Sequence, residues 1–191
     1  TEALEQVICK LEGGHRTMLA ANGLSAVTHA LLAFVKSGDH ILVPDTAYQP
    51  ARKFCEGILK RFGVENTYYD PLIGAGIFGL MKPNTTLLYT ERPGSQTFEI
   101  QDIPAIAAAA HAKGAWVLMD NTWASPLYFK PFQHGVDVSI QAATKYIVGH
   151  ADAMLGSITA NERATPQLTE QAHLLGIGVG TEECYLGLRG I

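Results

Sequence analysis

The sequence predicts an α/β fold with three layers, α/β/α, around a mostly parallel sheet. Short apolar runs alternate along the chain with segments of helical periodicity, a pattern typical of βαβ units with right-handed crossovers. Hydrophobic residues make up 47% of the 191 residues and charged residues 17%, a balance expected for strands buried on both faces. At this length we expect residues 1–191 to form one domain.

The first elements expected are a helix, a short strand and a second helix. Apolar residues follow helical spacing from Leu4 to Leu11, and the pair Gly13–Gly14 ends that helix. A short apolar segment at 17–21 is the first strand. Gly23 then opens a helix whose apolar residues continue to Val35.

The next elements alternate between strand and helix. A Ser-Gly-Asp turn precedes a strand at 40–43, and a helix over 52–61 follows. Gly63 then leads into a strand at 64–68, and another strand is expected at 85–89.

The second half begins with an alanine-rich helix over 104–113, which Gly114 closes. Strands are expected at 115–119, 138–141 and 155–160, and a helix over 166–175 comes near the end.

The composition excludes several classes of protein. The net charge of -4, without a cluster of basic residues, argues against a nucleic-acid or anionic-membrane surface. No apolar run reaches the roughly 18 residues of a membrane span, and residues 1–20 lack the pattern of a signal peptide. The three cysteines are widely spaced, which indicates free thiols in a reducing cytoplasm.

Two residues at the ends of apolar runs carry the strongest functional signal. Asp120 follows the run at 115–119, and Lys145 lies in the small-residue loop after the run at 138–141. Ligands of parallel sheets bind beyond the carboxyl ends of the strands, so we expect both residues and the turn before Gly23 on one side. Enzymes that bind pyridoxal phosphate use these two groups: a lysine that forms a Schiff base and an acid that pairs with the pyridine nitrogen.

Each of these residues also has a structural interpretation. Asp120 would equally serve as a cap for the turn through Asn121 and Thr122, and Lys145 as a surface lysine with its stem on apolar neighbours. The turn before Gly23 either binds a phosphate at the helix N-terminus or is only structural. Tyr48 either stacks on a planar cofactor or is a packing or surface tyrosine.

Two other segments are less specific. The stretch Glu91–Ser95 follows a strand and either reaches the pocket or is a plain loop. His150 and Asp152 have the chemistry of metal ligands, but no third ligand has a sensible spacing, so no metal site is expected.

The chain resembles the Cys/Met-metabolism family of pyridoxal-phosphate enzymes over essentially its whole length. The resemblance is carried by Leu-Glu-Gly-Gly at 11–14, Asp-Pro-Leu-Ile-Gly-Ala at 70–75, Asp-Asn-Thr-Trp-Ala at 120–124, Ser-Ile-Gln-Ala-Ala-Thr-Lys-Tyr at 139–146 and Gly-His at 149–150. The sequences at 70–75 and 141–143 are similar to those of the family's β-lyase branch. The resemblance implies the large cofactor-binding domain of fold-type I, the aspartate-aminotransferase-like architecture.

The resemblance also assigns roles to individual residues. Lys145 would hold the cofactor covalently, Asp120 would pair with its ring nitrogen, and Tyr48 would stack over the ring. The amides of Gly23 and Leu24 and the hydroxyl of Thr144 would hold the phosphate. The chain departs from many relatives in having no hydroxyl at 141–143, and Gly94–Ser95 where they have Asn-Pro.

The implied reaction is β-elimination of the amino acid cystathionine to homocysteine, pyruvate and ammonia, with Lys145 as general base and Tyr48 also at the catalytic centre. A γ-lyase or γ-synthase of the same family, or a non-catalytic truncated domain that keeps the fold, is the alternative.

The family's N-terminal arm with a Tyr-x-Arg pair and its C-terminal domain are not found in these residues. We therefore expect a fragment that is inactive alone, from a protein that forms a homo-oligomer, a dimer of dimers.

Overall fold

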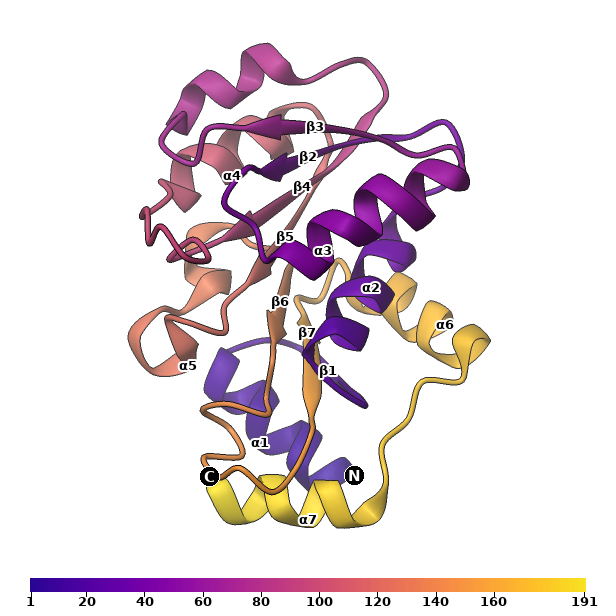
Figure 1. Ribbon diagram of the computed structural model, residues 1–191, viewed down its shortest axis with the longest axis vertical. Helices are drawn as coiled ribbons and strands as arrows, with labels where there is room; N and C mark the ends of the chain where they lie inside the picture. Colours follow the sequence, from indigo (N-terminus) through magenta and orange to yellow (C-terminus); the bar gives the residue numbers. More distant parts are fainter.

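A single seven-stranded sheet forms the centre of the molecule in a computed structural model that describes residues 1–191 (Figure 1). The strand order is β1-β7-β6-β5-β4-β2-β3. Strand β7 alone runs antiparallel to its neighbours, and the others run parallel to one another. The strands are β1 Arg16–Ala20, β2 His40–Pro44, β3 Glu65–Tyr69, β4 Thr85–Glu91, β5 Trp116–Asp120, β6 Val138–Gln141 and β7 Gly156–Ala160. The predicted α/β fold with a mostly parallel sheet is confirmed.

Helices cover both faces of this sheet. Helices α2 and α6 pack together on one face, α4 lies with η2 on the other, and α1 and α7 lie side by side near β1 (Figure 1). None of the helices is both long and apolar enough to cross a bilayer. The helices are α1 Glu2–Glu12, α2 Gly23–Phe34, α3 Gln49–Phe54, α4 Ile103–Ala112, α5 Ser125–Tyr128, α6 Thr165–Leu175 and α7 Thr181–Gly190, with short π or 3-10 turns η1 Cys55–Leu59, η2 Gly74–Leu80 and η3 Pro131–His134.

Alternation along the strands builds a core on each face. In β4, Leu87 and Tyr89 pack into the cluster beneath α2, whereas Leu88 packs into the cluster beneath α4. All three side chains are at most 1% exposed. Successive side chains of a strand point to opposite faces, so the strands that read as continuous apolar runs are those buried on both sides.

Most predicted elements lie where the sequence placed them, but helix α7 and the short elements η2, α5 and η3 were not predicted. One predicted helix also differs in its start and type. The helix expected over 52–61 begins earlier, at Gln49, and its second half is the π-helical turn Cys55–Leu59. Pro50 accounts for the earlier start, because its fixed backbone angle suits the first turn of a helix. Strand β4 also continues two residues beyond the predicted end, to Glu91, and this extension brings an acid to the edge of the sheet.

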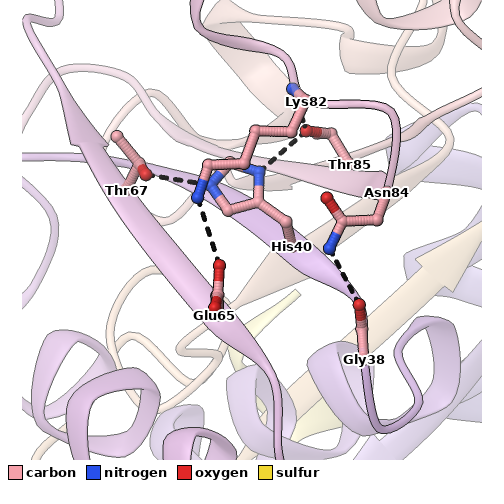
Figure 2. Close-up of polar contacts among 7 residues, drawn as sticks. All are labelled: Gly38, His40, Glu65, Thr67, Lys82, Asn84 and Thr85. Carbon is pink, nitrogen blue, oxygen red and sulfur yellow. Dashed lines mark hydrogen bonds and ion pairs between the residues drawn. The ribbon is translucent and has the colours of Figure 1, made fainter.

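The amino ends of the three neighbouring strands β2, β3 and β4 carry a polar group that we call the His40 cluster, drawn with all its members in Figure 2. The His40 ring bonds to the Thr85 hydroxyl through Nδ1 (2.7 Å) and to the Thr67 hydroxyl through Nε2 (2.9 Å). Lys82 donates its backbone N–H to Thr85 Oγ1 and its ammonium to Glu65. Burial, and then the Lys82 charge, lowers the pKa of His40 below its ordinary value. The cluster therefore joins three strands through a neutral, buried imidazole.

Candidate active site

A cavity of about 300 Å³ lies at the carboxyl ends of the parallel strands. It collects residues that are far apart in the sequence, as expected for this edge of an α/β sheet. A wider hollow of about 910 Å³, walled by residues 45–50 and 95–98, shares several of its residues. The lining of the smaller cavity is Asn22, Gly23, Leu24, Val27, Tyr48, Glu91, Ser95, Asp120, Thr122, Trp123, Ala142, Thr144, Lys145 and Met154. The structure thus brings every predicted site residue into one place.

The N-terminus of α2 forms one wall of this cavity. Asn22 caps the helix, and its Oδ1 accepts from the Ser25 N–H (2.8 Å). The N–H groups of Gly23 and Leu24 have no acceptor within the chain. A Cβ at Gly23 would lie 2.5 Å from Cβ of Ala142, so glycine is needed there for close approach to the lysine loop. The result is a pair of free donors at the positive end of a helix dipole.

Asp120 is the last residue of β5 and is 9% exposed. Its Oδ1 accepts from the Thr122 N–H (3.0 Å), so the turn-capping role considered for it is present in the structure. Burial raises the pKa of Asp120, while hydrogen bonding from Thr122 and the charge of Lys145 partly offset that rise. A desolvated acid of this kind gains from a cationic partner in the cavity.

Glu91 is a second buried acid in the cavity. From the sequence, the stretch that begins with Glu91 could either reach the pocket or form a plain loop. Glu91 is the last residue of β4 and the register partner of Asp120 on β5. Its two oxygens accept from the Tyr48 N–H (2.8 Å) and from the Ser95 hydroxyl. Burial, and then the charge of Asp120, raises the pKa of Glu91 to about 8. An acid at the end of a second parallel strand was the signal that could have identified it.

Lys145 and Tyr48 lie opposite each other at the mouth of the cavity. The Nζ atom of Lys145 is 6.0 Å from the centre of the Tyr48 ring. Both side chains are exposed, Tyr48 by 44%. Lys145 therefore lines the cavity on its open side. Its exposure also agrees with the alternative interpretation as a surface lysine.

The loop between Lys145 and β6 is held by local hydrogen bonds. The Thr144 hydroxyl donates to the Leu155 carbonyl (3.0 Å) and accepts from the Leu155 N–H (2.8 Å). The Ala142 N–H donates to the Thr122 hydroxyl (2.7 Å). The Thr144 hydroxyl proton is thus directed to the start of β7, and a phosphate contact from it requires the hydroxyl to rotate.

His150 and Asp152, which have the chemistry of metal ligands, each contact another group of the chain. Asp152 forms an ion pair with Arg189 (2.7 Å), and the His150 Nδ1 atom contacts the Val148 carbonyl (3.0 Å). No group of three or more His, Cys, Asp or Glu side chains is arranged to hold a metal ion.

A lysine and a buried acid at the carboxyl edge of such a sheet are the groups that pyridoxal phosphate requires of a protein. The family model for Cys/Met-metabolism pyridoxal-phosphate-dependent enzymes matches residues 1–191. The chain belongs to this family, whose members depend on pyridoxal phosphate and act on amino acids.

Individual relatives agree with this assignment. A protein of Rhizobium johnstonii is 53% identical over the whole chain, which covers 48% of that protein. Cystathionine beta-lyase MetC of Escherichia coli is 46% identical over 99% of the chain, which again covers 48% of its length. The crystal structure of metB from Corynebacterium glutamicum matches 98% of the chain and 49% of that protein, with a TM-score of 0.93 and 30% identity. The chain spans about half the length of the curated relatives it matches.

Proposed function

We propose that the chain is the cofactor-binding part of a pyridoxal-phosphate-dependent carbon–sulfur lyase that carries out β-elimination on cystathionine. The main observation behind this proposal is that one cavity is lined by Lys145, Asp120, Tyr48 and the free amides of α2. The similarity to cystathionine beta-lyase MetC of Escherichia coli supports the choice of reaction. The chain's match to about half of that protein supports its role as one domain of a longer enzyme.

The residues in the cavity fit the cofactor group by group. The unpaired N–H groups of Gly23 and Leu24 suit a phosphate, as at other helix N-termini. Asp120 is buried beside another acid and gains from a protonated ring nitrogen. The Lys145 amine would hold the cofactor covalently, and Tyr48 would stack against its ring. Thr144 would add a phosphate contact once its hydroxyl turns from Leu155.

When bound, pyridoxal phosphate supplies an electron sink for the charge that develops at the substrate α-carbon. The chain's own residues then have three tasks in the proposed reaction. Lys145 would release the cofactor when the substrate amine takes its place, and its free Nζ would accept the α-proton as general base. Asp120 would keep the ring nitrogen protonated, and Tyr48 would hold the ring in place. The Cβ–S bond breaks, homocysteine leaves with its sulfur, and addition of one water to the remaining fragment gives pyruvate and ammonia.

The test uses the full-length protein with added pyridoxal phosphate. The wild type should show visible absorption from the bound cofactor and should convert cystathionine to pyruvate, and Lys145→Ala should lose both. Absence of cofactor absorption in the wild type contradicts the cofactor role. Formation of 2-oxobutyrate in place of pyruvate would assign γ-elimination instead, the alternative within the family.

The oligomeric state is a further part of the proposal. Exposed apolar side chains lie on α5 and just before it, with Tyr128 at 84%, Leu127 at 74% and Trp123 at 47% exposure. Trp123 also lines the cavity, and groups of this kind mark surfaces that another chain or domain covers. We propose that the full-length protein is a homo-oligomer, a dimer of dimers, in the cytoplasm, where its free cysteines stay reduced. Light scattering on the purified full-length protein measures the number of subunits directly.

A further inference from the structure

Glu12, the last residue of α1, is a buried carboxylate on the face of the sheet opposite the cavity. It is 1% exposed, and its oxygens accept from the Ser139 hydroxyl (2.9 Å) and from Nε2 of Gln141 (2.7 Å). It forms no ion pair with a lysine or arginine. Lys130, the cation that acts on it, donates instead to the Leu11 carbonyl. Burial raises the pKa of Glu12. A buried acid without a cation adds little stability, so another role has to account for it.

The groups that Glu12 holds belong to the strand ends that carry the site. Gln141 is the last residue of β6, four positions before Lys145. Its Nε2 also donates to the carbonyl of Asn121 (3.2 Å), the residue directly after Asp120. A single amide group therefore joins α1 to the ends of both β5 and β6.

The same two strand ends are tied together on the cavity side. Thr122 accepts from the Ala142 N–H and donates its own N–H to Asp120. The spacing between Asp120 and Lys145 is thus set by two layers of hydrogen bonds, one on each face of the sheet. Supporting layers of this kind hold a site within the small tolerances that chemistry needs.

We propose that Glu12 is a positioning residue that fixes Gln141 and, through it, the distance between Asp120 and Lys145. This role rests on the cofactor function proposed above for those two residues. Glu12 itself does not line the cavity, and the residues that donate hydrogen bonds to it, Ser139 and Gln141, do not line it either. Loss of the Glu12–Gln141 bond should therefore change the spacing of the groups around the bound cofactor, although every group that contacts the cofactor is still present.

The experiment exchanges the two partners in the full-length protein loaded with cofactor. In Glu12→Gln the amide oxygen still accepts from Gln141 and the Ser139 hydroxyl can turn to accept, so behaviour near wild type is expected. Gln141→Glu places two carboxylates against each other and removes the donor to Asn121. The double variant Glu12→Gln/Gln141→Glu restores an amide–acid pair. Gln141→Met removes the donor to Glu12 and Asn121 without adding a second carboxylate, and it serves if Gln141→Glu does not fold.

The readouts are the cofactor dissociation constant and the pH midpoint of the cofactor's visible absorption, because a purely structural residue moves neither. We expect Gln141→Glu or Gln141→Met to weaken cofactor binding about tenfold, as for outer partners of metal ligands, and to shift the midpoint. The double variant should recover the part of the loss that comes from the two opposed carboxylates, whereas the part that comes from the missing donor to Asn121 should remain. Thr85→Val, which destabilises the fold from the opposite edge, is the control and should leave both readouts unchanged.

The outcomes separate the two proposals. If Gln141→Glu and Gln141→Met lower the melting temperature as Thr85→Val does but leave affinity and midpoint at wild-type values, the positioning role is wrong and the cofactor function stands. If the wild type binds no cofactor, both are wrong.

Discussion

The two ends of the parallel strands both carry clusters of charged and polar residues, but their charged groups are paired to different degrees. At the amino ends, both ring nitrogens of His40 are bonded and Lys82 is paired with Glu65 (Figure 2). At the carboxyl ends, Glu91 and Asp120 lie in register on neighbouring strands, and Lys145 forms no ion pair. The amino edge pairs its charges within the chain, whereas the carboxyl edge places two buried acids beside each other and leaves the Lys145 amine without an ion pair.

This difference separates a structural cluster from a binding site. Buried groups that are fully hydrogen-bonded add order and stability, whereas a pair of buried acids and a free amine lower stability and persist where a ligand completes them. Changes at the amino edge should therefore alter the stability of the protein, and changes at the carboxyl edge should alter its chemistry.

The largest expected effect is the loss of activity on replacement of Lys145. Lys145→Ala in the full-length protein should lower kcat by about 10³-fold or more, because the general base and the covalent attachment are lost together. Since Lys145 is exposed and forms no ion pair, the melting temperature of the cofactor-free protein should change little. Steady-state kinetics and thermal unfolding of the same preparation measure both quantities.

Lys82→Ala is the matched variant at the amino edge. It removes an exposed ion pair with Glu65, for which about 1 kcal/mol or less of the free energy of unfolding is expected, and kcat should stay at the wild-type value. A loss of activity in Lys82→Ala comparable to that in Lys145→Ala would contradict the division between the edges.

The next effect is on stability, through Thr85 in the His40 cluster. Thr85→Val keeps the shape of the side chain but leaves the Lys82 N–H and a nitrogen of His40 without their partner. We expect a loss of about 2–4 kcal/mol in the free energy of unfolding, measured by urea denaturation, because each buried group loses its bond. Thr86→Val is the control on the same strand, since the Thr86 hydroxyl is buried without a partner, and it should be neutral or slightly stabilising. Equal losses in the two variants would show that the cluster bonds contribute nothing.

Sequence patterns were sufficient to predict the sheet and the edge where the site lies. Asp120 and Lys145 could be placed together because carboxyl ends of parallel strands share one edge. Glu91 remained ambiguous because the apolar run at 85–89 ends before it, and only pairing with β5 extends the strand to bring the acid beside Asp120. Glu12 lies in one of the segments that carry the family resemblance, but its contacts could not be predicted, since its partners on β6 are more than 120 positions away and helical periodicity gives no sign of them.

A smaller effect should follow the ionisation of Glu91. Its folded pKa, about 8, lies above the value of 4.5 in the unfolded chain, so the native state binds the proton more tightly and stability falls as pH rises between these values. Glu91→Gln removes this dependence. Relative to wild type, the variant should gain on the order of 1–3 kcal/mol between pH 5 and pH 8 in the cofactor-free protein. A gain that is independent of pH would mean that Glu91 is ionised throughout.

The smallest expected effect has the opposite sign and comes from His40. Because its folded pKa lies below the ordinary 6.5, the unfolded chain takes up the proton first, and the stability that the neutral ring provides is lost as pH falls below 6.5. His40→Gln cannot titrate, so the difference in unfolding free energy between wild type and variant should shrink on acidification, by at most about 1.4 kcal/mol for each pH unit. Urea denaturation at several pH values between 7 and 5 measures this slope. With Glu91→Gln measured in parallel, the two edges should give slopes of opposite sign, and equal signs would mean that the buried imidazole and the buried acid are not held in their neutral forms.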